Sequence, residues 1–332
     1  MNVLINCPSK LSIIDNKLGG VESLSLALAN KLKKKKINVT ISSLNKRSLK
    51  INNIENIPIS IIKKKSKLLN FDTIISSNDA RIFNHFPQCK NKILWMHNQL
   101  QIEKSIRKKQ FLSIIKNKIT AVFVSKYLDS ITSNLYFFNK RSIINNFLLA
   151  EFTFKKFIIR KRKPVFVWSV QRSKGLNDTI KMWIENINSI HPEAKFYILG
   201  LDKLPNKLKS EYLKSKSIFH LGRVSKTKLR NIYSQSTAMI CLGYDETFCL
   251  NALEANSCGL PVISFGKTAL NDFIKNNYNG FIVNNFIDIP EKIKFLLKMN
   301  NKKRQKLTND SIQYSKQFSL NNIIYKWLNL LK

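Results

Sequence analysis

The chain contains 332 residues, enough for about two domains of ~150 residues, and its hydrophobic fraction of 44% excludes a disordered chain. Lysine and arginine number 57 against 20 acidic residues, which gives a formal net charge of +37. Such a charge attracts nucleic acid, anionic lipid or phosphorylated substrates, although the chain is also rich in Ile and Asn, so a compositional bias explains the lysine excess equally well.

Strand-like and helix-like segments alternate along the first half of the chain. A strand is expected at 2–7, followed by a loop and a helix whose apolar residues share one face and which ends in the lysines 33–36. Further strand-like segments lie at 37–42, 71–76, 92–97 and 119–125, and the segment 141–148 closes this half.

A basic, proline-containing joint at 158–164 separates this half from a second series of the same kind. In this second half, strands or strand-like segments are expected at 165–170, 194–200, 217–222, 238–242 and 261–265, and helices at 175–190, around 226–236, at 247–257 and at 321–331. Alternating strands and helices favour parallel sheets, and the joint favours two of them. Ligands of open parallel sheets bind beyond the carboxyl ends of strands, so functional residues are expected there.

Two of the scarce carboxylates, Glu246 and Glu254, lie in an apolar stretch at 244–264. On the expected helix, the polar positions Thr247, Asn251 and Glu254 are spaced to share one face, so this stripe is expected to border a cavity. A buried carboxylate needs hydrogen-bond donors, and a ribose diol would supply two. The alternative is that Glu254 simply faces solvent.

The segment "ETFCLNALEANSCGLPVI" at 246–263 resembles the E-x7-E signature of the family 4 retaining glycosyltransferases, usually close to EGFGLxxLEAxxCGxPVI. The resemblance implies an α/β protein of the GT-B fold, with two Rossmann-like domains whose parallel sheets face each other across a cleft. Residues 1–157 would form the acceptor-side domain and 158–318 the donor-side domain, and a last helix at 319–332 would cross back to the first domain.

The same resemblance implies roles for the residues of this segment. Glu254 would bind the nucleotide ribose and Glu246 the hydroxyls of the donor sugar. The residues expected to contact the donor are Thr247, Phe248, Cys249, Leu250 and Asn251, the amides of the middle three facing the sugar or diphosphate. Thr247 and Cys249 stand where the family often has glycine, which leaves open how closely the donor approaches there.

Other segments match the family at single positions. "VFVWSVQRSKGL" resembles the strand and loop that bring cations to the diphosphate, with Lys174 as the secure match and Arg172 as the less secure one. Fixed cations there would stabilise the charge of the leaving nucleoside diphosphate. "FHLGRVSKTKL" resembles the segment that borders the base, with Gly222 and Arg223 at a strand end.

The first half matches less tightly. Gly19 and Gly20 precede a helix, where similar glycines of the family enter the cleft, although a plain turn explains them too. His97 ends a strand where related enzymes place a histidine that reaches the donor sugar. Asn146 matches the asparagine of the family's "PNG" turn, in which Phe147 replaces the glycine.

The resemblance therefore implies a metal-independent retaining glycosyltransferase without a cofactor, for which His97, Lys174, Arg172 and Glu246 are the candidate catalytic residues. Its partners would be a nucleotide-diphosphate sugar and a glycan or lipid-linked acceptor, used in cell-surface polysaccharide or glycoconjugate synthesis. An anionic membrane surface is a further candidate partner, through the basic segment 104–118, on grounds of charge alone.

Several patterns are absent from the sequence. It has no D-x-D, no P-loop, no CxxC pair, no apolar run of membrane-spanning length and no leader-like N-terminus, and its five cysteines are scattered. Reduced thiols in a cytoplasmic protein are expected. Two alternatives stay open: a basic nucleic-acid or membrane-surface binding protein on a degenerate version of this fold, and a GT-B sugar-nucleotide epimerase.

Overall fold

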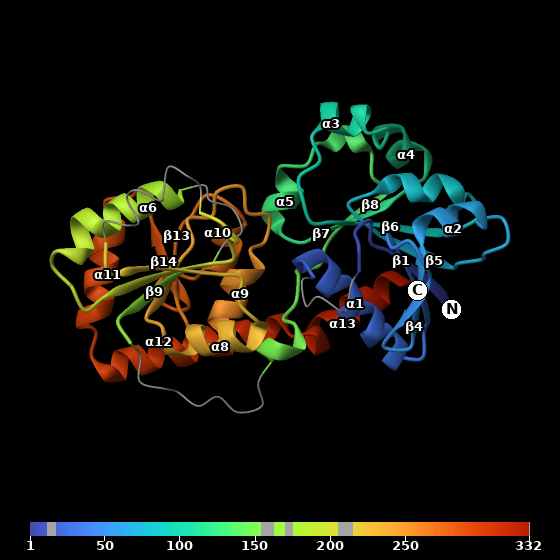
Figure 1. Cartoon of the computed structure of the whole chain (residues 1–332). Helices are drawn as coiled ribbons and strands as arrows, with labels where there is room; N and C mark the ends of the chain where they lie inside the picture. The colour runs from blue at the N-terminus through green and yellow to red at the C-terminus, as the bar shows by residue number, and fades with distance from the viewer. Residues whose placement is uncertain (12–17, 154–162, 170–174, 205–214, 332) are drawn as a thin grey trace. The chain divides into compact units, whose positions relative to one another are not determined.

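The computed structural model describes residues 1–11, 18–153, 163–169, 175–204 and 215–331. These residues form two compact α/β units (Figure 1): an N-terminal unit, Met1–Leu149 with Leu320–Lys332, and a C-terminal unit, Ala150–Ser319. The division between them falls at 149/150 rather than at the expected 157/158. The reason is that the 3-10 turn η3, Ala150–Phe152, packs on a helix of the C-terminal unit, where Glu151 pairs with Lys226 at 3.3 Å.

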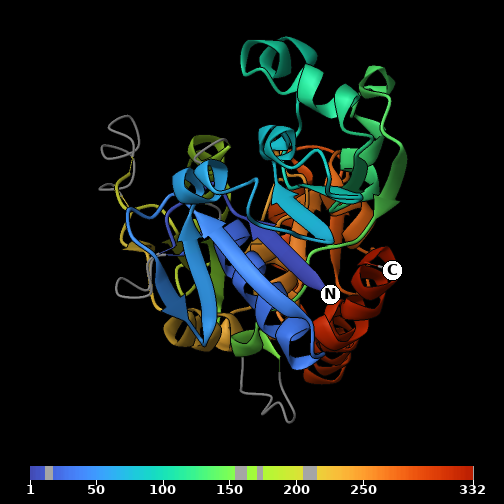
Figure 2. The same cartoon turned by 90° about the vertical axis from the view of Figure 1, so that its right-hand side faces the viewer.

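The described strands of the N-terminal unit form an eight-stranded sheet in the order β3-β4-β2-β1-β5-β6-β7-β8. All its neighbouring strands are parallel except the hairpin pair β3–β4. The strand bounds are β1 Asn2–Asn6, β2 Asn38–Ser43, β3 Leu49–Ile51, β4 Ile54–Pro58, β5 Thr73–Ser77, β6 Asn91–Met96, β7 Thr120–Phe123 and β8 Lys140–Ile143. Figure 2 shows strands of this unit side by side.

The helices of the N-terminal unit lie between and around these strands (Figure 1). Their bounds are α1 Gly20–Lys34, α2 Ile59–Lys64, η1 Ala80–His85, α3 Ile102–Arg107, α4 Phe111–Lys116, α5 Lys126–Ser130, η2 Asn134–Tyr136 and α13 Leu320–Leu331. The last helix packs into this unit, since the ring of Trp327 lies 4.8 Å from that of Trp95 and the Asn91 side chain donates to the Leu330 carbonyl at 2.6 Å.

The described strands of the C-terminal unit form a six-stranded parallel sheet in the order β11-β10-β9-β12-β13-β14. The strand bounds are β9 Val165–Ser169, β10 Lys195–Leu199, β11 Ile218–Gly222, β12 Ala238–Ile240, β13 Val262–Phe265 and β14 Gly280–Val283. Figure 1 shows α6 and α8 on opposite sides of this sheet. The helix bounds are α6 Leu176–Trp183, the π-helical turn η4 Ile184–Asn188, α8 Lys226–Gln235, α9 Leu250–Ser257, α10 Ala269–Phe273, α11 Asp288–Lys298, α12 Asn301–Ser315 and η5 Lys316–Phe318.

Both sheets have a topological switch point, where strand order reverses and where ligands of doubly wound folds bind. In the N-terminal unit the chain leaves β1 for β2 on one side and reaches β5 on the other. In the C-terminal unit β10 lies on one side of β9 and β12 on the other. The carboxyl ends of β1 and β5, and of β9 and β12, therefore mark the two places where a ligand site is expected.

No helix among the described residues is both long and apolar enough to cross a membrane.

Candidate functional site

The stretch with the two glutamates lies at the switch point of the C-terminal unit. It leaves the carboxyl end of β12, forms a loop and enters α9, while the backbone after β9 leads to Gly175 at the start of α6. Gly175 has φ +81°, and a Cβ there would lie 2.7 Å from the Tyr244 ring and 2.8 Å from Leu242. Gly175 thus packs against the residues that follow β12, and a side chain at position 175 would collide with them.

The helix α9 begins at Leu250, three residues later than the sequence predicted. Its N-cap, Cys249, has φ +64° and ψ +76°, a left-handed backbone that no continuous helix can contain. The expected polar face of this helix therefore lacks Thr247, which lies in the loop. Asn251 and Glu254 remain on α9, three positions apart. The left-handed backbone also explains the glycine usual at position 249 of the family signature.

Glu254 lies inside the protein, with only 7% of its surface exposed. Burial raises the pKa of its carboxyl from 4.5 to about 8; Lys226 opposes that rise and Glu151 adds to it. Lys226 on α8 and Glu151 in η3 form an ion pair with each other, and their side chains are 38% and 48% exposed. The alternative that Glu254 faces solvent is wrong for this unit, since the side chain is buried and burial is the largest cause of its raised pKa.

Asn251 ties α9 to the neighbouring strand end. Its side-chain amide donates to the carbonyl of Ser169, the last residue of β9, and the Ser169 hydroxyl accepts a 2.7 Å hydrogen bond from Tyr233 on α8. Tyr233 is fully buried, and the pKa of its phenol is raised well above 10 by burial and then by the nearby Glu254 carboxyl. Sequence analysis missed both Tyr233 and Ser169, because nothing in the local pattern shows that α8 reaches this strand end.

The loop before α9 leaves some of its side chains accessible. Glu246 and Thr247 are half-buried, whereas Phe248 packs its ring 6.1 Å from that of Phe318 and is 5% exposed. The Glu246 backbone is held at both ends, because its N–H donates to the Gly243 carbonyl at 3.2 Å and its carbonyl accepts from Ala269 at 3.3 Å. Glu246 is thus placed on a fixed backbone in the loop that leads to α9.

Two thiols lie beneath this loop. The sulfur atoms of Cys241 and Cys249 are 3.5 Å apart, and both side chains are buried. This contact holds the start of the loop against its end, and it raises the pKa of the Cys249 thiol well above its ordinary value. All five cysteines are free and buried, as the scattered spacing predicted.

The predicted base-bordering residues, Gly222 and Arg223, lie at the carboxyl end of β11. Gly222 has φ +63° and its carbonyl accepts from the Gly200 amide at 2.9 Å. Arg223 is half-exposed and pairs with Asp202 at 3.2 Å. These residues share the strand-end edge of the sheet with α9, but β10 and β9 separate them from β12. The two predicted diphosphate cations, Arg172 and Lys174, lie outside the described residues.

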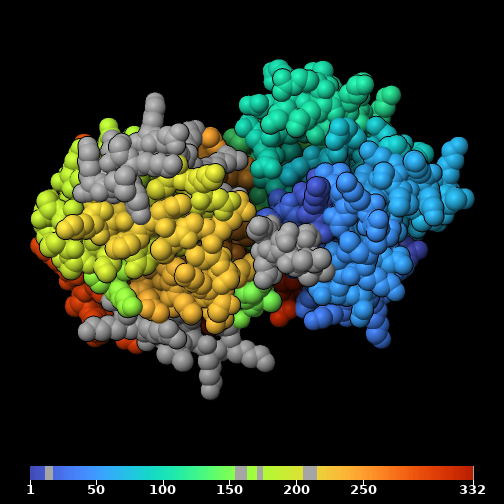
Figure 3. Space-filling model, in the orientation of Figure 1, coloured from blue at the N-terminus to red at the C-terminus, as the bar shows by residue number. Residues whose placement is uncertain are grey.

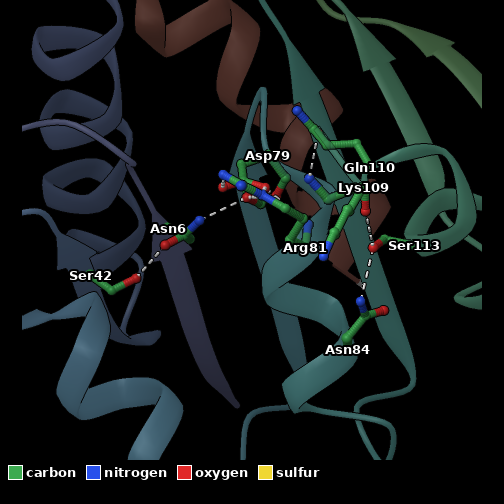
Figure 4. Close-up of polar contacts among 10 residues, drawn as sticks. Asn6, Ser42, Asp79, Arg81, Asn84, Lys109, Gln110 and Ser113 are labelled. Atoms are coloured by element: carbon green, nitrogen blue, oxygen red, sulfur yellow. Dashed lines mark hydrogen bonds and ion pairs between the residues drawn. The ribbon is translucent and has the colours of Figure 1, made fainter. Parts of the chain in front are cut away.

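The switch point of the N-terminal unit carries a polar network (Figure 4). The amide of Asn6, at the end of β1, donates to the Ser76 hydroxyl at 2.9 Å and accepts from Ser42 at 2.8 Å. Gly19 is the N-cap of α1 and Gly20 its first residue, so both follow β1 as expected. The network ties together the strand ends of β1, β2 and β5.

His97 follows β6 and is 5% exposed. Its backbone N–H donates to the Asn78 side chain at 2.7 Å, and its ring lies 4.5 Å from that of Trp95. Burial lowers the pKa of this imidazole to about 3, so the ring is neutral at physiological pH and could exchange one hydrogen bond as donor or acceptor. Asn146 is buried too, at 4% exposure.

Within the described ranges, no three His, Cys, Asp or Glu side chains gather closely enough to hold a metal ion.

Comparison with known proteins gives a family match for the C-terminal unit. A sequence profile described as "Glycosyl transferases group 1" matches residues 151–314, which contain the whole site of the C-terminal unit. Residues 151–314, just under half of the chain, thus match the group 1 glycosyltransferases. The match begins at the same η3 turn that begins the C-terminal unit.

Individual glycosyltransferases are similar as well. An N,N'-diacetylbacillosaminyl-diphospho-undecaprenol alpha-1,3-N-acetylgalactosaminyltransferase of Campylobacter jejuni is 26% identical over 154 residues, which are 46% of this chain and 40% of that enzyme. The chain thus matches less than half the length of that relative.

Solved structures of similar fold cover the whole chain. Sucrose-phosphate synthase from Thermosynechococcus elongatus has a TM-score of 0.78 at 12% identity, covering 99% of this chain and 98% of that one. Anabaena HepE in complex with UDP and glucose has a TM-score of 0.76 at 12% identity, covering 100% and 99%. The two Rossmann-like units are those of the GT-B fold, as the resemblance predicted.

Proposed function

We propose that this chain is a retaining glycosyltransferase that moves a sugar from a nucleotide-diphosphate sugar to a glycan or lipid-linked acceptor. The observation that carries the proposal is Glu254: a carboxyl buried at the switch point of the donor-side sheet, with a pKa raised to about 8 by burial. Such a group is costly unless a ligand supplies hydrogen-bond donors, and the two hydroxyls of a ribose fit a carboxylate. Glu254 would therefore hold the nucleoside.

The remaining donor contacts follow from the loop before α9. The N–H groups of Leu250 and Asn251 precede the first backbone hydrogen bond of α9, which Ala252 donates to the Cys249 carbonyl, so these two groups suit the diphosphate. Glu246 on its fixed loop would accept from hydroxyls of the sugar. Arg172 and Lys174 are proposed as the cations that stabilise the leaving diphosphate.

The proposed reaction needs no dedicated base residue to take the acceptor proton. The bond between the anomeric carbon and the diphosphate oxygen breaks, and the acceptor oxygen bonds to that carbon on the face that the diphosphate leaves. The acceptor proton passes to the departing phosphate. The lack of a D-x-D motif favours a metal-independent reaction without a cofactor. The neutral His97 is proposed to hydrogen-bond the donor sugar from the N-terminal unit.

The acceptor class rests on the Campylobacter relative, whose name specifies an undecaprenol-diphosphate acceptor. We propose a saccharide on a lipid carrier, used in cell-surface polysaccharide or glycoconjugate synthesis, and therefore a cytoplasmic protein attached peripherally to the inner face of the membrane. The +37 charge supports attraction to that surface.

The test is release of nucleoside diphosphate from a panel of nucleotide-sugars, measured with and without an undecaprenol-diphosphate saccharide. We expect release that depends on the acceptor and a product that keeps the anomeric configuration of the donor. Conversion of the nucleotide-sugar into its epimer, without net release of nucleoside diphosphate, would indicate the epimerase alternative. A product with inverted configuration would contradict the retaining mechanism.

A further inference from the structure

The segment 102–116 of the N-terminal unit forms two short helices, and their outer side is both apolar and basic. Figure 1 shows α3 and α4 together at one end of this unit, and Figure 3 shows that end in space-filling form. We name this side the α3–α4 surface, defined by the exposed residues Lys104, Ile106, Arg107, Lys108, Lys109, Leu112, Ile115 and Lys116. Its three aliphatic side chains, Ile106, Leu112 and Ile115, are 57%, 62% and 40% exposed.

In this segment polar side chains are buried and aliphatic side chains are exposed, the reverse of the usual pattern. The polar residues Ser105, Gln110 and Ser113 are 0%, 5% and 2% exposed, whereas the aliphatic residues beside them face outward. Hydrogen bonds hold the polar residues inside: Gln110 accepts from the Ala80 amide at 3.0 Å, and Ser113 accepts from Asn84 at 2.8 Å (Figure 4). These bonds fix the rotation of α4, so its exposed aliphatic residues cannot turn inward without leaving buried polar groups unpaired.

The break between the helices explains why a single-helix projection shows no apolar stripe. Lys109 has φ +56°, a left-handed backbone between the end of α3 and the start of α4. This residue resets the helical phase, so Ile106 and Ile115 are both exposed although they would lie apart on one continuous helix.

The charges around these aliphatic residues are almost all positive. The segment 102–118 contains six Lys or Arg residues and one acid, Glu103. All six cations are exposed, and within the described part of the chain none of them forms an ion pair. The positive charge of this surface is therefore uncompensated.

The turn η2 adds further exposed apolar side chains next to the α3–α4 surface. It contacts α4, and its residues Leu135 and the following Phe137 are 57% and 72% exposed. Phe137 also has a left-handed backbone, φ +47°, which a bulky aromatic residue adopts rarely. An exposed aromatic ring beside exposed aliphatic and basic side chains is the composition of a membrane-interface segment.

We propose that the α3–α4 surface docks on the surface of an anionic lipid bilayer, with Ile106, Leu112 and Ile115 entering the headgroup region and the surrounding cations contacting lipid phosphates. Charge alone would suit a nucleic acid, but phosphate contacts to nucleic acid gain nothing from exposed aliphatic side chains. A bilayer uses both features at once. The inference concerns attachment and does not rest on the proposed sugar transfer.

The first test is flotation of the full chain with vesicles of phosphatidylcholine alone or mixed with phosphatidylglycerol. The charge variant Lys104→Gln/Arg107→Gln/Lys108→Gln is compared with the matched control Lys46→Gln/Arg47→Gln/Lys50→Gln, which removes three exposed cations elsewhere in the same unit. We expect the first to lower partitioning onto anionic vesicles by roughly a hundredfold and the second by far less. Equal losses would overturn the proposal, because overall charge would then explain the binding.

The second test separates insertion from charge attraction. Because all five native cysteines are buried, Leu112→Cys adds a single accessible thiol for an environment-sensitive fluorophore, and Leu68→Cys, at a position 85% exposed, is its control. We expect anionic vesicles to increase and blue-shift the emission at position 112 and to leave position 68 unchanged. Binding without a change at position 112 would overturn the insertion of this surface.

A third comparison covers the nucleic-acid alternative and folding. Ile106→Ser/Leu112→Ser/Ile115→Ser is expected to weaken vesicle binding by about tenfold or more and to leave binding to duplex DNA unchanged. Circular dichroism checks that this variant keeps its fold, which the exposure of all three side chains predicts. Unchanged vesicle binding in this variant, or binding of the chain to duplex DNA alone, would contradict the proposal.

Discussion

At the scale of single residues, the site depends on side chains in unfavourable environments. Glu254 is a buried carboxyl, and Cys249 occupies a left-handed backbone position that glycine fills in the family signature. Either feature costs folding free energy, and the cost of Glu254 is offset when a ligand donates hydrogen bonds to it. Substitutions that relieve the cost at Glu254 are therefore expected to raise the free energy of unfolding and to weaken nucleotide binding.

The raised pKa of Glu254 predicts how stability depends on pH. Its pKa of about 8 in the folded chain exceeds its ordinary value of 4.5, so the folded state holds the proton more tightly between these values. This contribution to the free energy of unfolding is full below the ordinary pKa and falls as pH rises toward 8, by at most about 1.4 kcal/mol per unit. Glu254→Gln should flatten the fall between pH 5 and 8. Urea denaturation of both proteins at several pH values measures this, and parallel curves would contradict it.

Substitutions of Cys249 test whether the loop needs a left-handed backbone at this position. Cys249→Gly should keep the loop and the response to nucleotide, because glycine adopts this φ without strain. Cys249→Val should cost about 1–2 kcal/mol of unfolding free energy, since a β-branched residue fits this region poorly. Thermal unfolding with and without UDP compares the two variants. A valine variant as stable and as responsive as the glycine variant would show that the backbone differs from the one described.

At the scale of elements, the C-terminal helix α13 belongs to the N-terminal unit. Trp327 is fully buried and packs edge-on against Trp95, while Asn91 caps the Leu330 carbonyl. Trp95 in turn contacts the His97 ring, so this cluster supports a candidate site residue.

Truncation of the Trp327 side chain should lower the free energy of unfolding. Trp327→Ala is expected to lower the unfolding free energy by about 3–5 kcal/mol, the usual cost of removing a buried large aromatic side chain. Tyr325→Ala, which changes a residue 61% exposed on the same helix, is the matched control and should cost less than 1 kcal/mol. Denaturant unfolding measures both, and equal losses would show that α13 is not packed as described.

The sequence predicted most strands within two residues because buried parallel strands are long apolar runs with clear ends. It missed the β3–β4 hairpin, although Asn52 and Asn53, both with positive φ, form the kind of two-residue turn that joins hairpins. The start of α9 was misplaced because apolar spacing cannot show a left-handed N-cap. Tyr233 and Ser169 could not be predicted, since their meeting depends on which helix covers which strand end.

At the scale of the whole molecule, the GT-B fold places one Rossmann-like unit on each side of the joint, and each unit has its own switch point. Glu254 and Asn251 lie at one of them, and Asn6 with Gly19 at the other. The proposal assigns the nucleotide to the C-terminal unit. The excess of positive charge is distributed over both units, and at the α3–α4 surface it combines with the exposed aliphatic side chains described above.

The most direct test is the rise in melting temperature that UDP, GDP or ADP produces in the wild-type chain and in Glu254→Gln. One nucleotide at saturating concentration should raise the melting temperature of the wild type by several degrees, since ligand at a hundred times its Kd contributes about 2.7 kcal/mol. Glu254→Gln should lose most of that rise, and Glu103→Gln, an exposed acid of the other unit, should retain it. An undiminished rise in Glu254→Gln would contradict the assignment of this carboxyl to the nucleotide.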